Sequence, residues 1–192
     1  MTGYTDAQGG YVSTALYDAI VNGHLFLWDE IDASNPAALV AFNSLMDNGW
    51  IEIPGKGRVR AHKNFVCIAA ANTFGKGADR VYVGRNQLDG ATLERFQTIH
   101  MDYDEDLELE IALGIWAGAA PWVEKIQRYR AVAEKLNILH IISPRASYNG
   151  AQTLRDIDEG NAPAMLTEDM VEDHAVWKGL EPGQVAKIKE AA

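Results

Sequence analysis

Two adjacent carboxylates after a short apolar run are the residues best suited to chemistry in this sequence. Leu25–Trp28 is apolar, and Asp29-Glu30 follows it directly. Such a run is typical of a buried strand in a parallel sheet covered on both faces, and open α/β sheets bind ligands at the carboxyl ends of their strands. The first carboxylate could hold the water shell of Mg²⁺, and the second could orient an attacking water. The pair therefore indicates a magnesium–nucleotide site, although a helix-capping role fits it equally well in isolation.

Three polar residues farther along the sequence fit the same chemistry. Asn72 ends the apolar run Phe65–Ala71, where its amide could contact a γ-phosphate or the attacking water, or could be an ordinary turn residue. Arg95 ends a short predicted helix, where it could stabilise charge on a neighbouring subunit's nucleotide or pair with an acidic neighbour on the surface. Arg145 lies at a predicted helix start, where it could donate to phosphate or be solvated.

An α/β part over residues 1–103 is expected to position the first three of these features. Asn35-Pro36 is a good helix start, because Asn caps a helix and Pro fits its first position, and Gly49 ends the same helix. Pro54–Gly57 is expected to be a hairpin turn with a basic tip, and residues 1–10 a loop. The other expected elements are helices at Tyr11–Asn22 and Ala91–Phe96, and strands at His24–Trp28, Trp50–Ile53, Arg58–Ala61, Phe65–Ala71 and Thr98–Met101.

The pattern becomes helical after Asp102, so residues 104–192 are expected to form a small helical part. The acidic run Asp102–Glu110 is expected to be a solvated face that also places negative charge favourably at a helix N-terminus. The expected helices are Leu107–Trp116, one that passes through Val123 and Leu136, one that opens at Ser143-Pro144, and Thr167–Lys178.

Composition excludes several classes of protein. The formal net charge of −10 argues against a general nucleic-acid or anionic-membrane surface. Cys67 is the only cysteine, so no internal disulfide can form, and we expect it to be a core residue. No apolar stretch approaches the roughly 20 residues that span a bilayer, and the N-terminus lacks the features of a signal peptide. The single cysteine and the lack of a membrane-spanning or signal segment favour a cytoplasmic location. The five histidines are dispersed without ligand spacing, so we expect no metal centre built from histidine and cysteine.

The order of these features resembles that of the AAA+ ATPases. A strand with Asp29-Glu30, a strand with Asn72, a helix ending in Arg95-Phe96 and a helical part with Ser143-Pro-Arg145 occur in that sequence. The chain is similar to the dynein-related and MoxR-like branch, and to the AAA+ subunit of cobalt chelatase. In that comparison Asp29-Glu30 corresponds to the Walker B motif, Asn72 to sensor 1, Arg95 to the arginine finger and Arg145 to sensor 2.

The resemblance implies a role for each of these residues. Asp29 would coordinate Mg²⁺ through water, Glu30 would polarise the attacking water, and Asn72 would help to position that water. Arg145 would sense the γ-phosphate of ATP bound to its own chain, and Arg95 would act on the ATP of the adjacent protomer. The implied cofactors are ATP and Mg²⁺, and the implied partners are other AAA+ protomers in a homo-oligomeric ring, such as a hexamer, and a protein substrate or adaptor.

Two further features are weaker candidates. Arg85 lies in a predicted loop and is a second candidate for a contact between subunits, ranked below Arg95. The hairpin around Lys56 could be a pore or substrate insertion, but a solvated basic turn is the preferred interpretation.

The motif that grips phosphate in this family is absent from the sequence. It requires Gly-x-x-x-x-Gly-Lys-Ser/Thr, whose backbone amides cradle the phosphates and whose lysine neutralises them. Gly55-Lys56 and Gly75-Lys76 are not followed by Ser or Thr, and both come after Asp29-Glu30. Three explanations stay open: a fragment or internal start of a longer gene, which we favour; half of a split ATPase; or a degenerate, non-hydrolysing paralogue.

The sequence therefore predicts a partial α/β AAA+ core followed by a helical lid, with two functional hypotheses. The first is an ATP hydrolase that couples hydrolysis to the remodelling of a protein partner or to the loading of a metal. The second is a subunit that packs into an AAA+ ring, donates Arg95 to a neighbour and hydrolyses nothing itself. The identity of the remodelled substrate is not encoded in any of these motifs.

Overall fold

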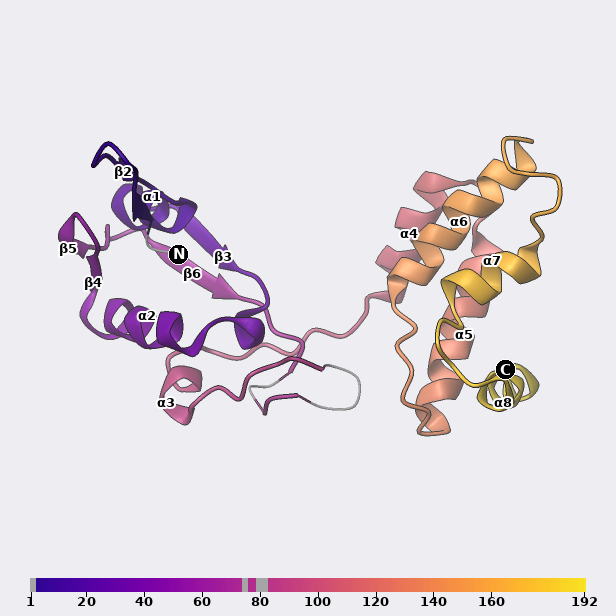
Figure 1. The fold of residues 1–192 in the computed structure, drawn as a ribbon. Coiled ribbons are helices and arrows are strands. Elements are labelled where there is room, and N and C mark those ends of the chain that lie inside the picture. Colours follow the sequence, from indigo (N-terminus) through magenta and orange to yellow (C-terminus); the bar gives the residue numbers. More distant parts are fainter. Residues whose placement is uncertain (1–2, 74–75, 79–82) are drawn as a thin grey trace. The chain divides into compact units, whose positions relative to one another are not determined.

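The computed structural model describes residues 3–73, 76–78 and 83–192, and it divides the chain into two units, Met1–Ile99 and His100–Ala192 (Figure 1). The sequence places this division after residue 103. The first unit contains short strands and helices, and the second contains helices alone among its described elements. This agrees with the predicted fold class, an α/β part followed by a helical part.

The strands of the first unit form three two-stranded sheets in the described part of the chain. The parallel pair joins β3 (Leu25–Trp28) to β6 (Val66–Ala69), with Trp28 opposite Ala69. The other two pairs are antiparallel: β1 (Tyr4–Thr5) with β2 (Tyr11–Val12), and β4 (Trp50–Ile53) with β5 (Gly57–Arg60). The predicted hairpin and the two predicted parallel strands are therefore confirmed. The predicted N-terminal loop, residues 1–10, contains the strand β1, which pairs with β2.

Local signals set the limits of the helices in this unit. Thr14 caps α1 (Ala15–Asn22), and this start falls after the β2 residues that the sequence assigned to the helix. Asn35 caps α2 (Pro36–Asn48) by accepting the N–H of Ala37, and Gly49 ends α2 at a φ of 67°. The short helices are η1 (Ile31–Ala33) and α3 (Gly90–Leu93). The core beneath them is made by Leu16, Ile20, Trp28, Ile31, Leu39, Phe42, Leu45, Ile51, Ile53 and Leu88.

One expectation about the parallel sheet is wrong: its strands are not buried on both faces. Leu25 and Leu27 are 60% and 56% exposed, and Val66 and Ile68, which pair with them, are 50% and 48% exposed. The inner face, which carries Trp28, packs on the core. The alternation along β3 and β6 shows that only one face of this sheet is covered by the described residues.

The prediction of a strand at Thr98–Met101 is also wrong. These residues have no regular structure, and Ile99 and Met101 are 81% and 85% exposed. A strand is stabilised by its hydrogen-bonded neighbour, and in the described part of the chain this segment pairs with none. An apolar alternating sequence was therefore insufficient to form a strand.

The second unit is built from five described helices (Figure 1). They are α4 (Glu105–Ile115), α5 (Ala120–Lys135), α6 (Pro144–Asp158), α7 (Glu168–Ala175) and α8 (Pro182–Ala191). The first four match the predicted helices, whereas α8 was not anticipated. Their core includes Trp122, Val123, Ile126, Ala151, Val171, Trp177 and Ile188. No helix in the described ranges combines the length and apolar character needed to cross a membrane.

The acidic run at the start of α4 is not wholly solvated, which corrects the prediction made for it. Glu108 is 1% exposed and accepts hydrogen bonds from Arg130 on α5 and Ser147 on α6. Its carboxylate can be buried because donors from two other helices, α5 and α6, satisfy it. Glu108 therefore joins three helices of this unit.

Candidate functional site

The parallel pairing of β3 and β6 brings Asp29-Glu30 and Asn72 to the same edge of one sheet. The N–H of Ala70 donates to the carbonyl of Trp28 at 2.9 Å, and the N–H of Ile31 donates to the carbonyl of Ala70 at 3.0 Å. The two strands thus remain in register as they end. Asp29, Glu30 and Asn72 are all exposed at this edge, where open α/β sheets bind their ligands.

Glu30 has an unusual backbone conformation. Its φ and ψ are 52° and 46°, in the left-handed region that non-glycine residues rarely adopt. The conformation is held by the Glu30 N–H, which donates to Asp29 Oδ1 at 2.9 Å, and by the Glu30 carbonyl, which accepts from Ala33. A left-handed residue costs on the order of 1–2 kcal/mol, and such strain is concentrated at functional sites. The turn therefore presents Glu30 at the edge despite an energetic cost.

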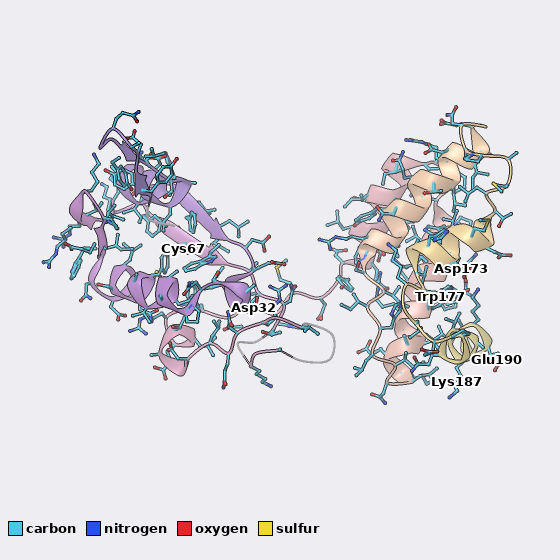
Figure 2. All side chains as sticks on the ribbon, viewed as in Figure 1. Asp32, Cys67, Asp173, Trp177, Lys187 and Glu190 are labelled. Carbon is cyan, nitrogen blue, oxygen red and sulfur yellow. The ribbon has the colours of Figure 1, made fainter. Side chains whose placement is uncertain are left out.

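Asp32, which no sequence motif indicated, holds together the loops at this edge. Its side chain is fully buried where the chain leaves β3 (Figure 2). Its Oδ2 accepts both the N–H of Thr73 at 3.0 Å and the hydroxyl of Thr73 at 2.8 Å. Because Thr73 directly follows Asn72, Asp32 ties the loop after β6 to the loop after β3. A third carboxylate within four residues was the only sequence signal for it.

Arg85 completes the group of side chains at this edge. Its Nη1 lies 3.3 Å from Asp32 Oδ1, and its Nη2 lies 3.0 Å from Glu30 Oε1. The next residue fixes the backbone there, because the N–H of Asn86 donates to the Asp32 carbonyl at 2.6 Å. The sequence suggested Arg85 for a contact between subunits, whereas the structure shows its guanidinium paired within its own chain.

Arg95, the predicted arginine finger, is engaged with α2. Its Nε donates to Asp47 Oδ1 at 2.8 Å, its Nη2 binds Asp47 Oδ2, and its Nη1 binds the carbonyl of Ala91. The hydrogen bond from Arg95 keeps the pKa of the Asp47 carboxyl below its ordinary value. To reach another subunit's nucleotide, Arg95 would have to exchange this bidentate pair for a phosphate.

Arg145 belongs to the helical unit, at the second residue of α6. Its side chain is exposed, and within the described part of the chain it makes no hydrogen bond or ion pair. The first turn of α6 is nevertheless fixed, because the hydroxyl of Ser147 donates to Glu108 Oε1 at 2.5 Å. Arg145 is therefore an available cation on a helix N-terminus whose position is held from inside its unit.

The donor set at the sheet edge fits magnesium only when other ligands accompany it. Asp29 and Glu30 offer carboxylate oxygens, and Mg²⁺ is usually bound by one or two carboxylates together with waters and substrate phosphates. Among the described residues, no group of three or more His, Cys, Asp or Glu side chains could hold a metal ion. The edge therefore suits a cation that arrives with a phosphate, and residues 1–192 contain no Gly-x-x-x-x-Gly-Lys-Ser/Thr loop to hold that phosphate.

A known protein family matches the part of the chain that carries this edge. A model of the family described as "AAA domain (dynein-related subfamily)" matches residues 3–96, which include Asp29, Glu30, Asn72 and Arg95. The chain is 30% identical over 190 residues to "Gas vesicle ATPase GvpN1" of Halobacterium salinarum, and 26% identical over 186 residues to "Gas vesicle ATPase GvpN2" of the same organism. Each match covers 94% of this chain and 51% of the relative, so the chain spans about half the length of the curated relatives it matches.

Proposed function

The chain belongs, through residues 3–96, to the dynein-related branch of the AAA+ ATPases, and on that premise we propose that it is an ATPase module whose hydrolysis drives the remodelling of a protein partner or chelatase-type metal loading. The proposal rests on one observation above others. Paired parallel strands bring Asp29, Glu30 and Asn72 to one exposed edge, and all three lie within residues 3–96, which match the family's model.

In this proposal each residue at the edge acts on a different part of the reaction. Asp29 holds the water shell of the magnesium ion, which supplies charge neutralisation to the phosphates. Glu30 orients and deprotonates the attacking water, and the Asn72 amide positions that water. The left-handed turn supports this assignment, because it keeps the Glu30 carboxylate at the rim of the sheet rather than in the core.

Two arginines complete the proposed site. Arg145 binds the γ-phosphate of ATP on its own chain, which its exposed position at the start of α6 supports. Arg95 acts on the ATP of an adjacent protomer in a ring, after leaving Asp47. The ring, its other AAA+ subunits, the protein substrate and a cytoplasmic location are parts of this proposal that rest on the family.

The second candidate is a subunit that packs into an AAA+ ring and hydrolyses nothing itself. One observation favours it: the apolar outer face of the β3–β6 sheet is exposed among the described residues, and another subunit could pack against it. In that case Arg95 would serve a neighbour's nucleotide, while Asp29 and Glu30 would be inactive.

Turnover of Mg-ATP by the purified chain separates the two candidates. It should be measured with the chain alone and with a second AAA polypeptide that carries a Gly-Lys-Ser/Thr loop. We expect Glu30→Gln to lower turnover by about 100-fold or more, the scale of a lost general base. The matched control is Glu52→Gln, at an exposed carboxylate on the β4–β5 hairpin, and it should have no effect.

The possible results separate the two candidate functions. Turnover that Glu30→Gln abolishes supports the hydrolase, whether the chain acts alone or only with the second polypeptide. A chain that stays inactive but raises the turnover of the second polypeptide, and loses this effect in Arg95→Ala, supports the non-hydrolysing subunit. Turnover that is indifferent to both substitutions contradicts the assignment of the site.

A further inference from the structure

The hairpin formed by β4 and β5 carries a concentration of positive charge (Figure 1). Residues 56–63 include four lysines and arginines and no acidic residue, in a chain whose formal net charge is −10. Alternation along the strands separates the two faces of the hairpin. Ile51 and Ile53 are buried in the core, whereas Arg58 and Arg60 are exposed on the other face. The positive charge is therefore presented to solvent on one side.

The two arginines line an open cleft on that outer face. The cleft has a volume of about 490 Å³, and its walls are formed by Asn48, Trp50, Arg58 and Arg60. Trp50 lies opposite Arg60 in the strand register, and the guanidinium carbon of Arg58 lies 4.0 Å from the centre of the Trp50 ring. A cation–π contact of this kind restrains the guanidinium, so the cleft is partly ordered before a ligand arrives.

Little negative charge neutralises these arginines within the described part of the chain. The ion pair of Arg58 with Glu52 measures 3.8 Å and both side chains are 67% exposed, so it contributes little. Arg60 makes no hydrogen bond or ion pair with any described residue. The carboxylate of Asp47, which precedes Asn48, is already held by Arg95. The cleft therefore offers two guanidinium groups to an incoming anion.

The spacing of the two guanidinium groups suits an extended acidic peptide. Residues two apart on a strand lie on the same face, about 7 Å from each other, and Arg58 and Arg60 are related in this way along β5. An extended peptide with carboxylates on alternate residues has the same repeat. Each guanidinium can then bind one carboxylate through two parallel hydrogen bonds.

A nucleic acid fits this cleft less well. Proteins bind single strands by stacking the bases on open aromatic rings beside basic residues, whereas Arg58 already covers one face of Trp50. A duplex is bound through many phosphate contacts, and this hairpin offers only a short basic stretch on a chain of net negative charge. A short acidic peptide needs only the two guanidinium groups of the cleft.

We propose that this cleft is a docking site for an extended acidic segment of a partner protein, with Arg58 and Arg60 each binding one carboxylate. The sequence favours a solvated basic turn for the hairpin. The stacked Arg58 and the cleft beside it are the features that change this interpretation. The inference goes beyond the proposed function, because docking of this kind requires neither ATP nor its hydrolysis.

The test measures the fluorescence anisotropy of a labelled peptide as the purified full chain is added. The peptide is about eight residues long and alternates glutamate with serine, and a reference peptide has glutamine in place of glutamate. At a physiological salt concentration the acidic peptide should bind at least about tenfold more tightly than the reference. A labelled oligothymidine of about twenty nucleotides is the competing ligand class.

Single substitutions distinguish the cleft from a general effect of positive charge. Arg58→Gln and Arg60→Gln should each weaken peptide binding by about three- to tenfold, because each removes one bidentate partner. Arg60→Lys keeps the charge but lacks the guanidinium fork, so it should also lose at least about twofold. The matched control is Lys63→Gln, which removes an exposed charge from the same basic stretch but outside the cleft, and it should change the affinity by less than about twofold.

The outcomes decide the proposal without any measurement of hydrolysis. Preference for the acidic peptide that falls in the Arg58 and Arg60 variants, and persists in Lys63→Gln, supports the docking site. The proposal is wrong if the two peptides bind equally, if Arg60→Lys matches the wild type, or if Lys63→Gln weakens binding as much as Arg60→Gln. Tighter binding of the oligothymidine through the same arginines would make the cleft a nucleic-acid site instead. Amide spectra confirm that each variant is folded.

Discussion

Replacing Glu108 with glutamine is expected to destabilise the helical unit severely, although the two side chains have nearly the same shape. Glu108 is 1% exposed, and its two oxygens accept from Arg130 at 2.7 and 3.0 Å and from Ser147 at 2.5 Å. Glutamine retains one carbonyl oxygen, but its amide nitrogen would face the guanidinium as a second donor. The substitution therefore removes the only fully buried charge that faces Arg130 in the described part of the chain and replaces an acceptor with a donor.

The size of the effect follows from the burial of the two partners. Loss of one member of a buried ion pair costs about 3–5 kcal/mol. In the Glu108→Gln variant the Arg130 charge would still be partly compensated. Its side chain is 15% exposed to water, Glu105 lies 3.6 Å away, and the Ile142 carbonyl accepts its Nε–H at 2.8 Å. The net loss should therefore be about 2–4 kcal/mol. For a unit of this size that corresponds to a fall in melting temperature of roughly 10–25 °C.

Urea unfolding of the full chain, followed by amide signals of the helical unit, measures this loss directly. The matched control is Glu105→Gln on the same helix, because that carboxylate is 57% exposed and its loss should cost no more than about 1 kcal/mol. The double variant with Arg130→Met should be less unstable than the sum of the single variants, since it leaves no unpaired charge. A loss below about 1 kcal/mol in Glu108→Gln would refute the reasoning.

Three more predictions concern buried or half-buried groups elsewhere in the chain. Gly150→Ala should destabilise the helical unit by about 1–3 kcal/mol in urea unfolding, because a Cβ there would lie 2.2 Å from the indole of Trp122; an unchanged midpoint would contradict the packing. Burial raises the pKa of the Cys67 thiol to about 11, so its alkylation at neutral pH should be roughly 100-fold slower than that of a thiol with an ordinary pKa. For Glu172, burial would raise the carboxyl pKa, but hydrogen bonds and the charge of Lys189 outweigh burial and lower it below 4.5. The stability that this carboxylate contributes is therefore present above pH 4.5 and lost as the pH falls below it, which urea midpoints at several pH values will show.

Each of these predictions has a control within the same chain. Gly183→Ala in α8 should be harmless, because nothing lies within 4 Å of the added Cβ. Alkylation of Cys67 should become fast in urea; equal rates for folded and unfolded chains would contradict its burial. Glu172→Gln should flatten the acid part of the stability profile, and an unchanged slope would show that other carboxyl groups cause it.

The helix limits are where local chemistry was most informative. Asn35, Pro36 and Gly49 bound α2 as the sequence indicates, because a cap, a fixed φ and a left-handed residue act within one turn of the chain. Thr98–Met101 shows the opposite case. Its apolar pattern favours a strand, but a strand also needs a neighbour to bond with, and local sequence does not supply one.

Burial was harder to predict than secondary structure. The apolar runs of β3 and β6 indicate strands buried on both faces, yet Leu25 and Ile68 lie on an exposed face. The charged residue Glu108 is buried instead, because Arg130 and Ser147 approach it from two other helices. Hydrophobicity and charge describe what a side chain prefers, whereas burial depends on which elements pack over it.

The sequence by itself determined the order of the candidate site residues and the strands that carry them. Asp29, Glu30 and Asn72 each follow an apolar run, and parallel pairing of those runs is enough to bring them to one edge. Only the tertiary structure revealed that Arg85 binds the buried carboxylate of Asp32 at that edge. Arg85 is separated from Asp32 by 53 positions, and both lie outside the strands and helices with strong local patterns. Contacts between such residues depend on where loops meet in space, because side-chain hydrogen bonds between distant loops leave no periodic signal in the chain.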